Sequence, residues 1–186
     1  MEARSLERTD ADIRNRYDTL SAALHWLTAG LVISAIVIAL WADRAGRDLG
    51  LQLIFLHKSL GLTIFAVVVV RIGWRLFHRA PPYSLPLPMW QRIVSWIVHY
   101  SLYALMLALP ITGYLLSTKS MFPLEWFGNE IPKAPVSDET AEAADAAHGW
   151  LSWVAIWMVV LHVSAALWHQ FGMRDRLIAR MNPFST

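Results

Sequence analysis

The chain has 186 residues, of which 56% are hydrophobic and only 16% charged, whereas soluble domains carry about 25% charged residues. The net charge of +2 and the pI near 9.2 do not indicate a nucleic-acid partner, because the basic residues stand beside hydrophobic segments and form no separate basic face. The absence of cysteine excludes disulfides and every site built on thiolates.

Four apolar segments follow a polar tail, Met1–Asp18, which lacks the apolar core and cleavage site of a signal peptide. The segments lie at about Leu20–Ala42, Leu53–Phe77, Ile93–Ser117 and His148–Phe171. Each is close to the ~20 residues that a helix needs to cross the hydrocarbon core of a bilayer. We therefore expect an all-α integral membrane protein: one domain over residues 1–186, built as a bundle of four transmembrane helices in the lipid bilayer.

The three connectors differ in character. Asp43–Gln52 is short, His78–Arg92 is too rich in proline to continue a helix, and Thr118–Ala147 is the longest and is acidic. Within the last of these, Ser137 followed by Asp138 and Glu139 is typical of a helix start, with an N-cap residue and acids in the first turn. The fourth helix is therefore expected to begin before the membrane surface.

Lysine and arginine predict the orientation, because they are enriched on the cytoplasmic side of membrane proteins. Eleven of the sixteen would lie with the two tails and the second connector. The opposite side would hold the other five, which are Arg44, Arg47, Lys58, Lys119 and Lys133. Both termini should therefore face the cytoplasm.

Six of the seven histidines lie in or at the edge of an apolar segment, and only His78 stands in a polar connector, where we expect it to be solvated. A lone histidine at membrane depth is most simply a core residue that is hydrogen-bonded to a neighbouring helix. Six of them in four segments favour ligation of a cofactor, because ionisable side chains inside a membrane are costly and usually functional.

Four of these histidines are expected to form two pairs, because their positions in the helices place them at two depths in the bilayer. His57 and His148 would lie near the outer face, and His25 near the inner face. His162 follows His148 by 14 residues, which places it on the same helix face and roughly 21 Å deeper, beside His25. His99 has a depth similar to that of His25, so spacing alone leaves open which of them pairs with His162.

Haem suits such pairs better than a bare metal ion. Zinc sites usually add cysteine or carboxylate ligands, and the four apolar segments contain neither Asp nor Glu. Two axial histidines would occupy both open positions of a haem iron, which favours electron transfer over oxygen binding. A histidine-lined metal transporter is the weaker alternative.

Several further residues are candidates around these sites. Arg71 lies 14 residues after His57 and could pair with the propionates of the inner haem, as could Arg75, although both could be simple membrane anchors. Lys58 could serve the outer haem or extend to the interface. Glycines near the outer pair, Gly61 and Gly149, could let a flat group approach the backbone.

His169 lies seven residues beyond His162, toward the cytoplasm, beside Trp168. It could donate protons to, or accept them from, a substrate at the inner interface. An interfacial histidine with an ordinary hydrogen bond explains it equally well.

The chain resembles the bacterial cytochrome b561 family over about Tyr17–Pro183. The matching segments are Ala23-Leu24-His25-Trp26, His57-Lys58-Ser59-Leu60-Gly61-Leu62, Leu109-Pro110-Ile111-Thr112-Gly113 and His148-Gly149-Trp150 through His162. The intervals of 32 residues from His25 to His57 and 14 from His148 to His162 match the ligand spacing of the family.

The resemblance implies two haem b groups per chain in a bacterial inner membrane, with His25, His57, His148 and His162 as axial ligands, and it selects His25 over His99. It also implies exchange of electrons with membrane quinone. One activity of the family is oxidation of superoxide at the periplasmic face, which would make this chain a superoxide:ubiquinone oxidoreductase. Superoxide would be steered by Lys58, Lys119 or Lys133, but the acidic connector and Asp145 would repel an anion.

A second function follows equally from a haem-bearing bundle. The chain could be a membrane anchor subunit that relays electrons for a partner dehydrogenase, with the long outer connector as the docking surface. The short tails favour a self-contained protein instead.

Overall fold

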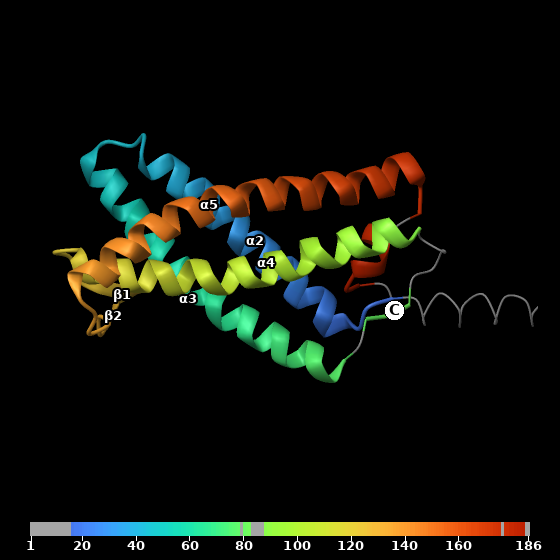
Figure 1. Ribbon diagram of the computed structural model, residues 1–186, viewed down its shortest axis with the longest axis horizontal. Helices are drawn as coiled ribbons and strands as arrows, with labels where there is room; N and C mark the ends of the chain where they lie inside the picture. The colour runs from blue at the N-terminus through green and yellow to red at the C-terminus, as the bar shows by residue number, and fades with distance from the viewer. Residues whose placement is uncertain (1–15, 79, 83–87, 176, 185–186) are drawn as a thin grey trace, which may run out of the picture.

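A bundle of four long helices forms the part of the chain that the computed structural model describes, which is residues 16–184 apart from 79, 83–87 and 176 (Figure 1). The helices are α2 (Thr19–Ala42), α3 (Arg47–Phe77), α4 (Met89–Leu116) and α5 (Asp138–Leu167). All four are long and apolar enough to cross a membrane. The predicted all-α fold with four transmembrane segments is confirmed; of the predicted tail, Met1–Asp18, only residues 16–18 lie within the described part.

Three of the helices begin earlier than the apolar segments do. α3 starts at Arg47, α4 at Met89 and α5 at Asp138. The predicted start of α5 is confirmed: the hydroxyl of Ser137 accepts a hydrogen bond from the backbone N–H of Thr140, which satisfies one of the unpaired donors of the first turn. At its other end, α5 continues as the π-helical turn η2 (Trp168–Met173), and the short η3 (Leu177–Met181) follows.

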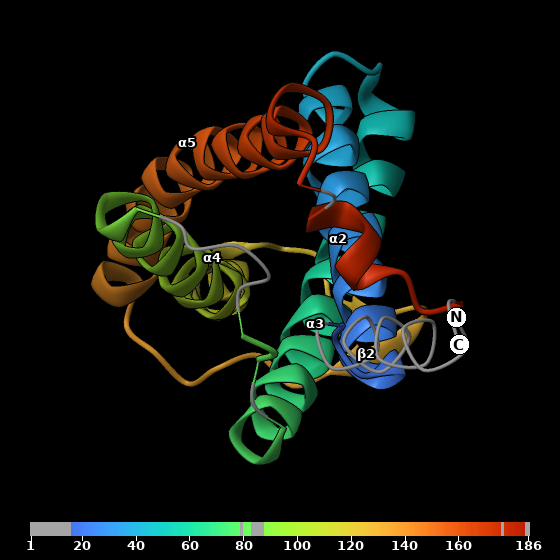
Figure 2. The same ribbon diagram turned by 90° about the vertical axis from the view of Figure 1, so that its right-hand side faces the viewer.

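The helices pack as two pairs, α2 with α3 and α4 with α5, and the pairs meet mainly between α3 and α4 (Figure 2). The turn between α2 and α3 is tight. A Cβ atom on Gly50 would lie 3.0 Å from the carbonyl oxygen of Ala42, so a larger residue would require the backbone at the end of α2 to shift, and glycine suits the position where α3 passes it.

The buried core of the bundle is small and holds Ala35, Ile64 and Val68. Many large apolar side chains lie on the outside instead, among them Trp41, Trp150 and Trp157, with 61%, 76% and 68% of their surface exposed. Exposing so continuous an apolar surface to water would be energetically unfavourable, whereas contact with lipid is not. The packing of the chain therefore agrees with a bilayer environment.

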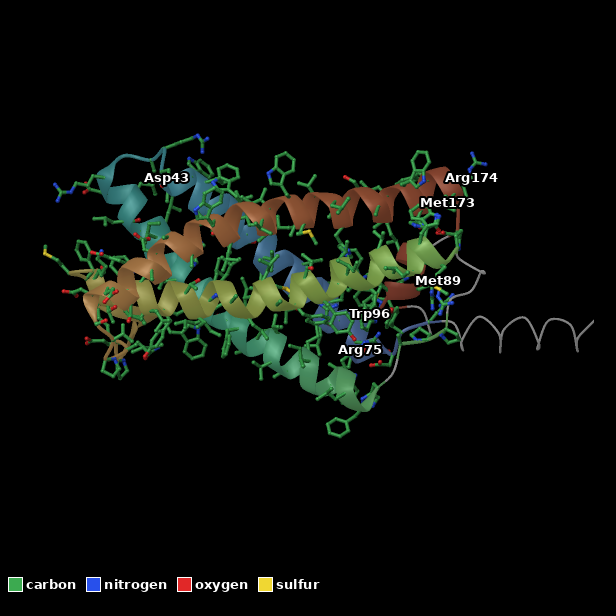
Figure 3. All side chains as sticks on the ribbon, viewed as in Figure 1. Asp43, Arg75, Met89, Trp96, Met173 and Arg174 are labelled. Atoms are coloured by element: carbon green, nitrogen blue, oxygen red, sulfur yellow. The ribbon has the colours of Figure 1, made fainter. Side chains whose placement is uncertain are left out.

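The described ends of the chain meet at one end of the bundle, the tail end, defined by Tyr17, Pro81–Pro82 and Arg180. The N–H of Tyr17 donates to the carbonyl of Arg180 at 3.2 Å, and Arg180 donates to the carbonyl of Pro82 at 2.7 Å. Figure 3 shows Arg75 and Arg174 at this end and Asp43 at the other. The described parts of both tails and of the second connector therefore lie at the same end of the bundle.

A short hairpin closes the opposite end, the hairpin end (Leu124–Ile131), and no sequence pattern predicted it. Strand β1 (Leu124–Trp126) pairs antiparallel with β2 (Asn129–Ile131). Phe127 and Gly128 form the turn with φ angles of 48° and 83°, the left-handed backbone that a two-residue hairpin loop needs. Two hydroxyl groups of α3 hold the hairpin: Ser59 accepts from the N–H of Phe127 at 3.0 Å, and Thr63 accepts from the indole of Trp126 at 3.1 Å.

Asp18 links α2 to α3 at the tail end. Its carboxylate caps α2 by accepting from the N–H of Ser21 at 2.9 Å and also accepts from the indole of Trp74 at 3.0 Å. Burial, the largest single influence, raises the pKa of the Asp18 carboxyl, but the hydrogen bonds from Ser21 and Trp74 outweigh it and hold the pKa below the ordinary value of 3.8. The ionised carboxylate therefore stabilises the folded state.

We expect Asp18→Ala to destabilise the protein by about 1 kcal/mol, because the cap of α2 is lost. Asp18→Asn should lose less, since the amide oxygen can still accept both hydrogen bonds. The stability contributed by ionisation is present above pH 3.8 and is lost as the pH falls through the lowered pKa; the Asn variant should lack this acid dependence. Thermal unfolding in detergent measures both effects, and equal midpoints for Asp18→Ala and the unsubstituted protein would contradict the role of the cap.

Candidate functional site

Two histidines from different helices face each other below the hairpin end. His57 comes from α3 and His148 from α5, and their ring centroids lie 6.3 Å apart with the ring planes nearly perpendicular, at 89°. An imidazole nitrogen binds a metal at about 2.0 Å, so two rings on opposite sides of one metal have centroids about 6 Å apart. The predicted outer pair is thus brought together at a separation that suits one metal between the rings.

In each of these rings, Nδ1 is hydrogen-bonded to a backbone carbonyl. The Nδ1 atom of His57 lies 3.0 Å from the carbonyl oxygen of Ala35, and Nδ1 of His148 lies 3.0 Å from that of Leu109. A carbonyl oxygen can only accept, so Nδ1 carries the proton in each ring and Nε2 keeps its lone pair. This arrangement is typical of metal-ligating histidines, in which a hydrogen bond on the second nitrogen fixes tautomer and orientation.

The His148 ring contacts the segment Leu109–Gly113 of α4. Besides the Leu109 carbonyl, the hydroxyl of Thr112 lies 3.0 Å from Nδ1 of His148. A Cβ atom on Gly113 would lie 3.2 Å from Cε1 of the same ring, so the glycine makes room for it. The roles of Thr112 and Gly113 were missed from the residues alone, and the only signal that could have found them was the match of this segment to a family motif.

A second pair lies toward the tail end, where His25 of α2 faces His162 of α5. Their ring centroids are also 6.3 Å apart, with the planes at 73°. Arg71 of α3 approaches this pair: its Nη2 lies 3.0 Å from Nδ1 of His25, and its guanidinium lies 5.3 Å from the centre of the Tyr103 ring. The structure thus brings Arg71 to the inner pair, as the sequence predicted.

His99 also lies near His162, but in a different geometry. Its ring centroid is 5.2 Å from that of His162, and its Nδ1 is hydrogen-bonded to the carbonyl of Ser95 in the preceding turn. A separation of 5.2 Å is short for two rings with a metal between them, whereas 6.3 Å is suitable. The distances therefore favour His25 over His99 as the partner of His162, a choice that the spacing of the sequence left open.

His169 lies in the π-helical turn η2 and pairs with an acid. Its Nδ1 lies 2.6 Å from Oδ2 of Asp175, whose side chain is only 6% exposed. The neighbouring Trp168 is 67% exposed. The ion pair confirms neither of the two interpretations of His169, but it identifies the partner that orients the ring.

His78 is the C-cap residue of α3 and is partly exposed. Its ring stacks on the indole of Trp74, one turn earlier, with centroids 3.6 Å apart, and its Nδ1 lies 3.1 Å from the Trp74 carbonyl. This stacking was not predicted from the position of His78 in a polar connector. Arg75, the other residue considered for the inner pair, lies over the ring of Tyr17 at 4.9 Å.

The lysines at the hairpin end are not equivalent. Lys119 forms an ion pair with Glu142 at 3.1 Å, which neutralises its charge locally. Lys133 donates to the carbonyl of Ser120 and lies near enough to Lys58 for the two charges to repel. Lys58 and Lys133 thus form the positive region closest to His57.

A cluster of three or more histidine, cysteine or acidic side chains that could hold a bare metal ion does not occur among the described residues. The histidines meet in pairs instead. A cofactor that brings its own equatorial ligands and requires only two from the protein fits this arrangement.

The family model for prokaryotic cytochrome b561 matches residues 16–183. The chain is 35% identical over 173 residues to cytochrome b561 homolog 2 of Escherichia coli (strain K12), a match covering 89% of this chain and 90% of that protein. It is 28% identical over 176 residues to probable superoxide oxidase CybB of Yersinia pestis, covering 92% and 98%. Cytochrome b561 homolog 1 of E. coli is 24% identical over 173 residues, covering 91% and 98%.

The residues present fit a b-type haem. Each pair supplies two facing imidazoles at a suitable separation, and the helices that carry the inner pair, α2 and α5, pack closely against other helices instead of each other. A Cβ atom on Gly61, one turn from His57 on α3, would meet nothing within 4 Å. Haem is flat and largely apolar and would fill such an interior.

We expect Gly113→Ala to weaken haem binding at the outer pair by about tenfold, because second-shell changes typically cost 10–100-fold in metal affinity. The added Cβ would stand 3.2 Å from the His148 ring and displace it. The matched control is Gly30→Ala on α2, an exposed position where the new methyl group would meet nothing within 4 Å. Haem content after purification, from redox difference spectra, measures the effect; equal haem content in both variants would contradict the role of Gly113.

Proposed function

Because the chain belongs to the prokaryotic cytochrome b561 family, we propose that it transfers electrons through the membrane by way of two b-type haems. His57 and His148 would be the axial ligands of the outer haem, and His25 and His162 those of the inner haem. Arg71 would be the cationic residue of the inner site.

The observation that carries this proposal is the repetition of one geometry at two depths. Both pairs have ring centroids 6.3 Å apart, and one member of each pair stands on α5. His148 and His162 are 14 residues apart, which is roughly 21 Å along a helix. Two sites so separated on one helix would span much of a hydrocarbon core that is about 30 Å thick.

Haem supplies a one-electron carrier, and the protein sets its access and potential. The residues of this chain would do the rest. The carbonyls of Ala35 and Leu109 keep Nδ1 of His57 and His148 protonated, so that Nε2 can bind iron. With both axial positions taken by histidine, oxygen would have no open site.

We propose that the tail end faces the cytoplasm of a bacterium and that the chain spans its inner membrane several times. The support is the excess of lysine and arginine in the two tails and the second connector. The described ends of the chain meet at the tail end, so both termini would be cytoplasmic.

We place the electron acceptor, a membrane quinone, near His169 and Trp168. Reduction of a quinone consumes two protons with two electrons, so the site needs a group that delivers protons. Asp175 accepts from Nδ1 of His169, so a proton taken up at Nε2 would give the ring a second N–H, which would donate to a quinone oxygen and pass its proton on. Trp168 is largely exposed at this depth and could pack against a flat quinone ring.

Superoxide is the first electron donor to test. A relative is named a probable superoxide oxidase, and Lys58 with Lys133 would attract an anion to the outer pair. Acidic residues oppose this: Asp138, Glu142 and Asp145 lie on one face of the part of α5 that precedes His148. That face supports the second candidate, a haem-bearing anchor subunit to which a partner dehydrogenase docks.

We expect His148→Ala to remove the outer haem alone and His162→Ala the inner haem alone, so that each variant keeps one haem per chain. His99→Ala should keep both, because its ring stands too close to His162 to share a metal with it. Pyridine haemochrome analysis with protein quantification measures the ratio. A single haem in the unsubstituted protein, or loss of neither haem in His148→Ala, would overturn the assignment.

We expect superoxide to reduce the haems of the purified protein and a soluble quinone analogue to reoxidise them. His169→Ala should slow quinone reduction by about 100-fold, the smaller end of the contribution of a general acid, with haem content unchanged. His78→Ala is the matched control, since that ring stacks on Trp74. Failure of superoxide to reduce the haems would favour the anchor subunit, and equal quinone rates in both variants would refute the role of His169.

A further inference from the structure

The two histidines of the outer pair differ in the number of acceptors around Nδ1. On α3, Nδ1 of His57 lies 3.0 Å from the carbonyl oxygen of Ala35, and among the described residues it has no second acceptor. On α5, Nδ1 of His148 lies 3.0 Å from the carbonyl oxygen of Leu109 and also 3.0 Å from the hydroxyl oxygen of Thr112. The additional contact with a hydroxyl group is therefore specific to His148.

The hydroxyl group of Thr112 accepts a hydrogen bond from His148. The Leu109 carbonyl can only accept, so the ring proton stands on Nδ1, which then has no lone pair for a hydroxyl proton. Thr112 has another acceptor for its own proton, because its hydroxyl lies 2.9 Å from the carbonyl oxygen of Ala108, one turn earlier in α4. The Thr112 oxygen can therefore accept from Nδ1–H of His148.

The atoms around this proton lie at equal distances from one another. Nδ1 of His148, the carbonyl oxygen of Leu109 and the hydroxyl oxygen of Thr112 are each 3.0 Å from the other two. An N–H that points between two acceptors placed in this way reaches both of them and forms a three-centre hydrogen bond. Both acceptors belong to α4, so this helix determines the surroundings of Nδ1.

The hydrogen bonds on Nδ1 are compatible with a group bound between the two rings. The ring centroids of His57 and His148 lie 6.3 Å apart, and Nε2 is the nitrogen of each ring that keeps its lone pair. Nδ1 and Nε2 of an imidazole point away from each other. Binding of a metal by Nε2 of His148 therefore leaves the contacts of Nδ1 with Leu109 and Thr112 in place.

A second acceptor increases the electron density of the His148 ring. Each acceptor draws the Nδ1 proton away from the ring, which makes Nε2 a more basic ligand. A more basic axial ligand stabilises ferric iron more than ferrous iron and so lowers the reduction potential of a haem. Thr112 is only partly exposed, on a helix in an apolar bundle, and a hydrogen bond is stronger in such surroundings than in water.

We propose that Thr112 is a positioning residue that lowers the reduction potential of the outer haem through its hydrogen bond with His148. The inference rests on the proposed function, because it requires a haem between His57 and His148. A lower potential at the outer haem favours transfer of one electron to the inner haem, by which the outer iron is oxidised and the inner iron is reduced.

The test is a potentiometric titration of the purified protein with both haems bound, followed by absorbance. Thr112→Val removes the hydroxyl group but keeps the shape and the charge of the side chain. The potential of the outer haem, which is the haem that His148→Ala loses, should rise by about 28 mV, a threefold change in the one-electron equilibrium. The inner haem should keep its potential.

Two further variants separate the hydrogen bond from a general effect of substitution. Thr112→Ser keeps the hydroxyl group and should keep the potential of the outer haem. Thr118→Val is the matched control, because the hydroxyl of Thr118 donates to the carbonyl of Leu115 in its own turn and, among the described residues, bonds to no histidine. This control should leave both potentials unchanged.

A second measurement reports the hydrogen bond itself. Redox-induced infrared difference spectra of protein with isotope-labelled histidine contain ring bands that respond to hydrogen bonding at Nδ1–H. The bands of one histidine should shift in Thr112→Val and stay in place in Thr118→Val.

An unchanged outer potential or unchanged histidine bands in Thr112→Val would overturn the inference. Loss of the outer haem from Thr112→Val would overturn it as well, because the hydroxyl group would then be needed to retain the ligand and would not tune it. Absence of a haem at the outer pair of the unsubstituted protein would instead refute the proposed function, so the two failures are distinguishable.

Discussion

Two imidazoles in the interior of this bundle, those of His57 and His148, each place Nδ1 against a backbone carbonyl of a neighbouring helix, and this constraint orients both rings. Polar groups in a membrane interior are costly unless they are paired, and the helices offer few free partners. For His57 the partner is the Ala35 carbonyl on α2, and for His148 it is the Leu109 carbonyl on α4. Each of these contacts joins two helices, so the hydrogen bonds that orient the two rings also link α3 to α2 and α5 to α4.

The two ends of the bundle differ in what surrounds the paired histidines. Near the hairpin end, the rings of His57 and His148 contact neutral backbone carbonyls, and Ser59 and Thr63 hold the hairpin to α3 close to His57 in the chain. Toward the tail end, the guanidinium of Arg71 approaches Nδ1 of His25 instead.

Much of the arrangement followed from local patterns. The four spans, the start of α5 at Ser137 and the approach of Arg71 to the inner pair depend on helix periodicity and capping, which act over a few turns. The hairpin escaped prediction because Phe127 stands at a left-handed position that usually carries glycine or asparagine. The stacking of His78 was not predicted, because its partner, Trp74, lies in the last turn of the preceding helix rather than in the connector itself.

The sequence by itself determined the membrane fold and the depth of each histidine, because hydropathy and a rise of 1.5 Å per residue convert position in the chain into depth in the bilayer. Spacing alone could not choose between His25 and His99, which have similar predicted depths on different helices, and it was the family resemblance that selected His25. The tertiary structure separates the two by distance, because their ring centroids lie 6.3 Å and 5.2 Å from that of His162. The reason is physical: depth follows from the helix, whereas lateral distance follows from how the helices pack against one another.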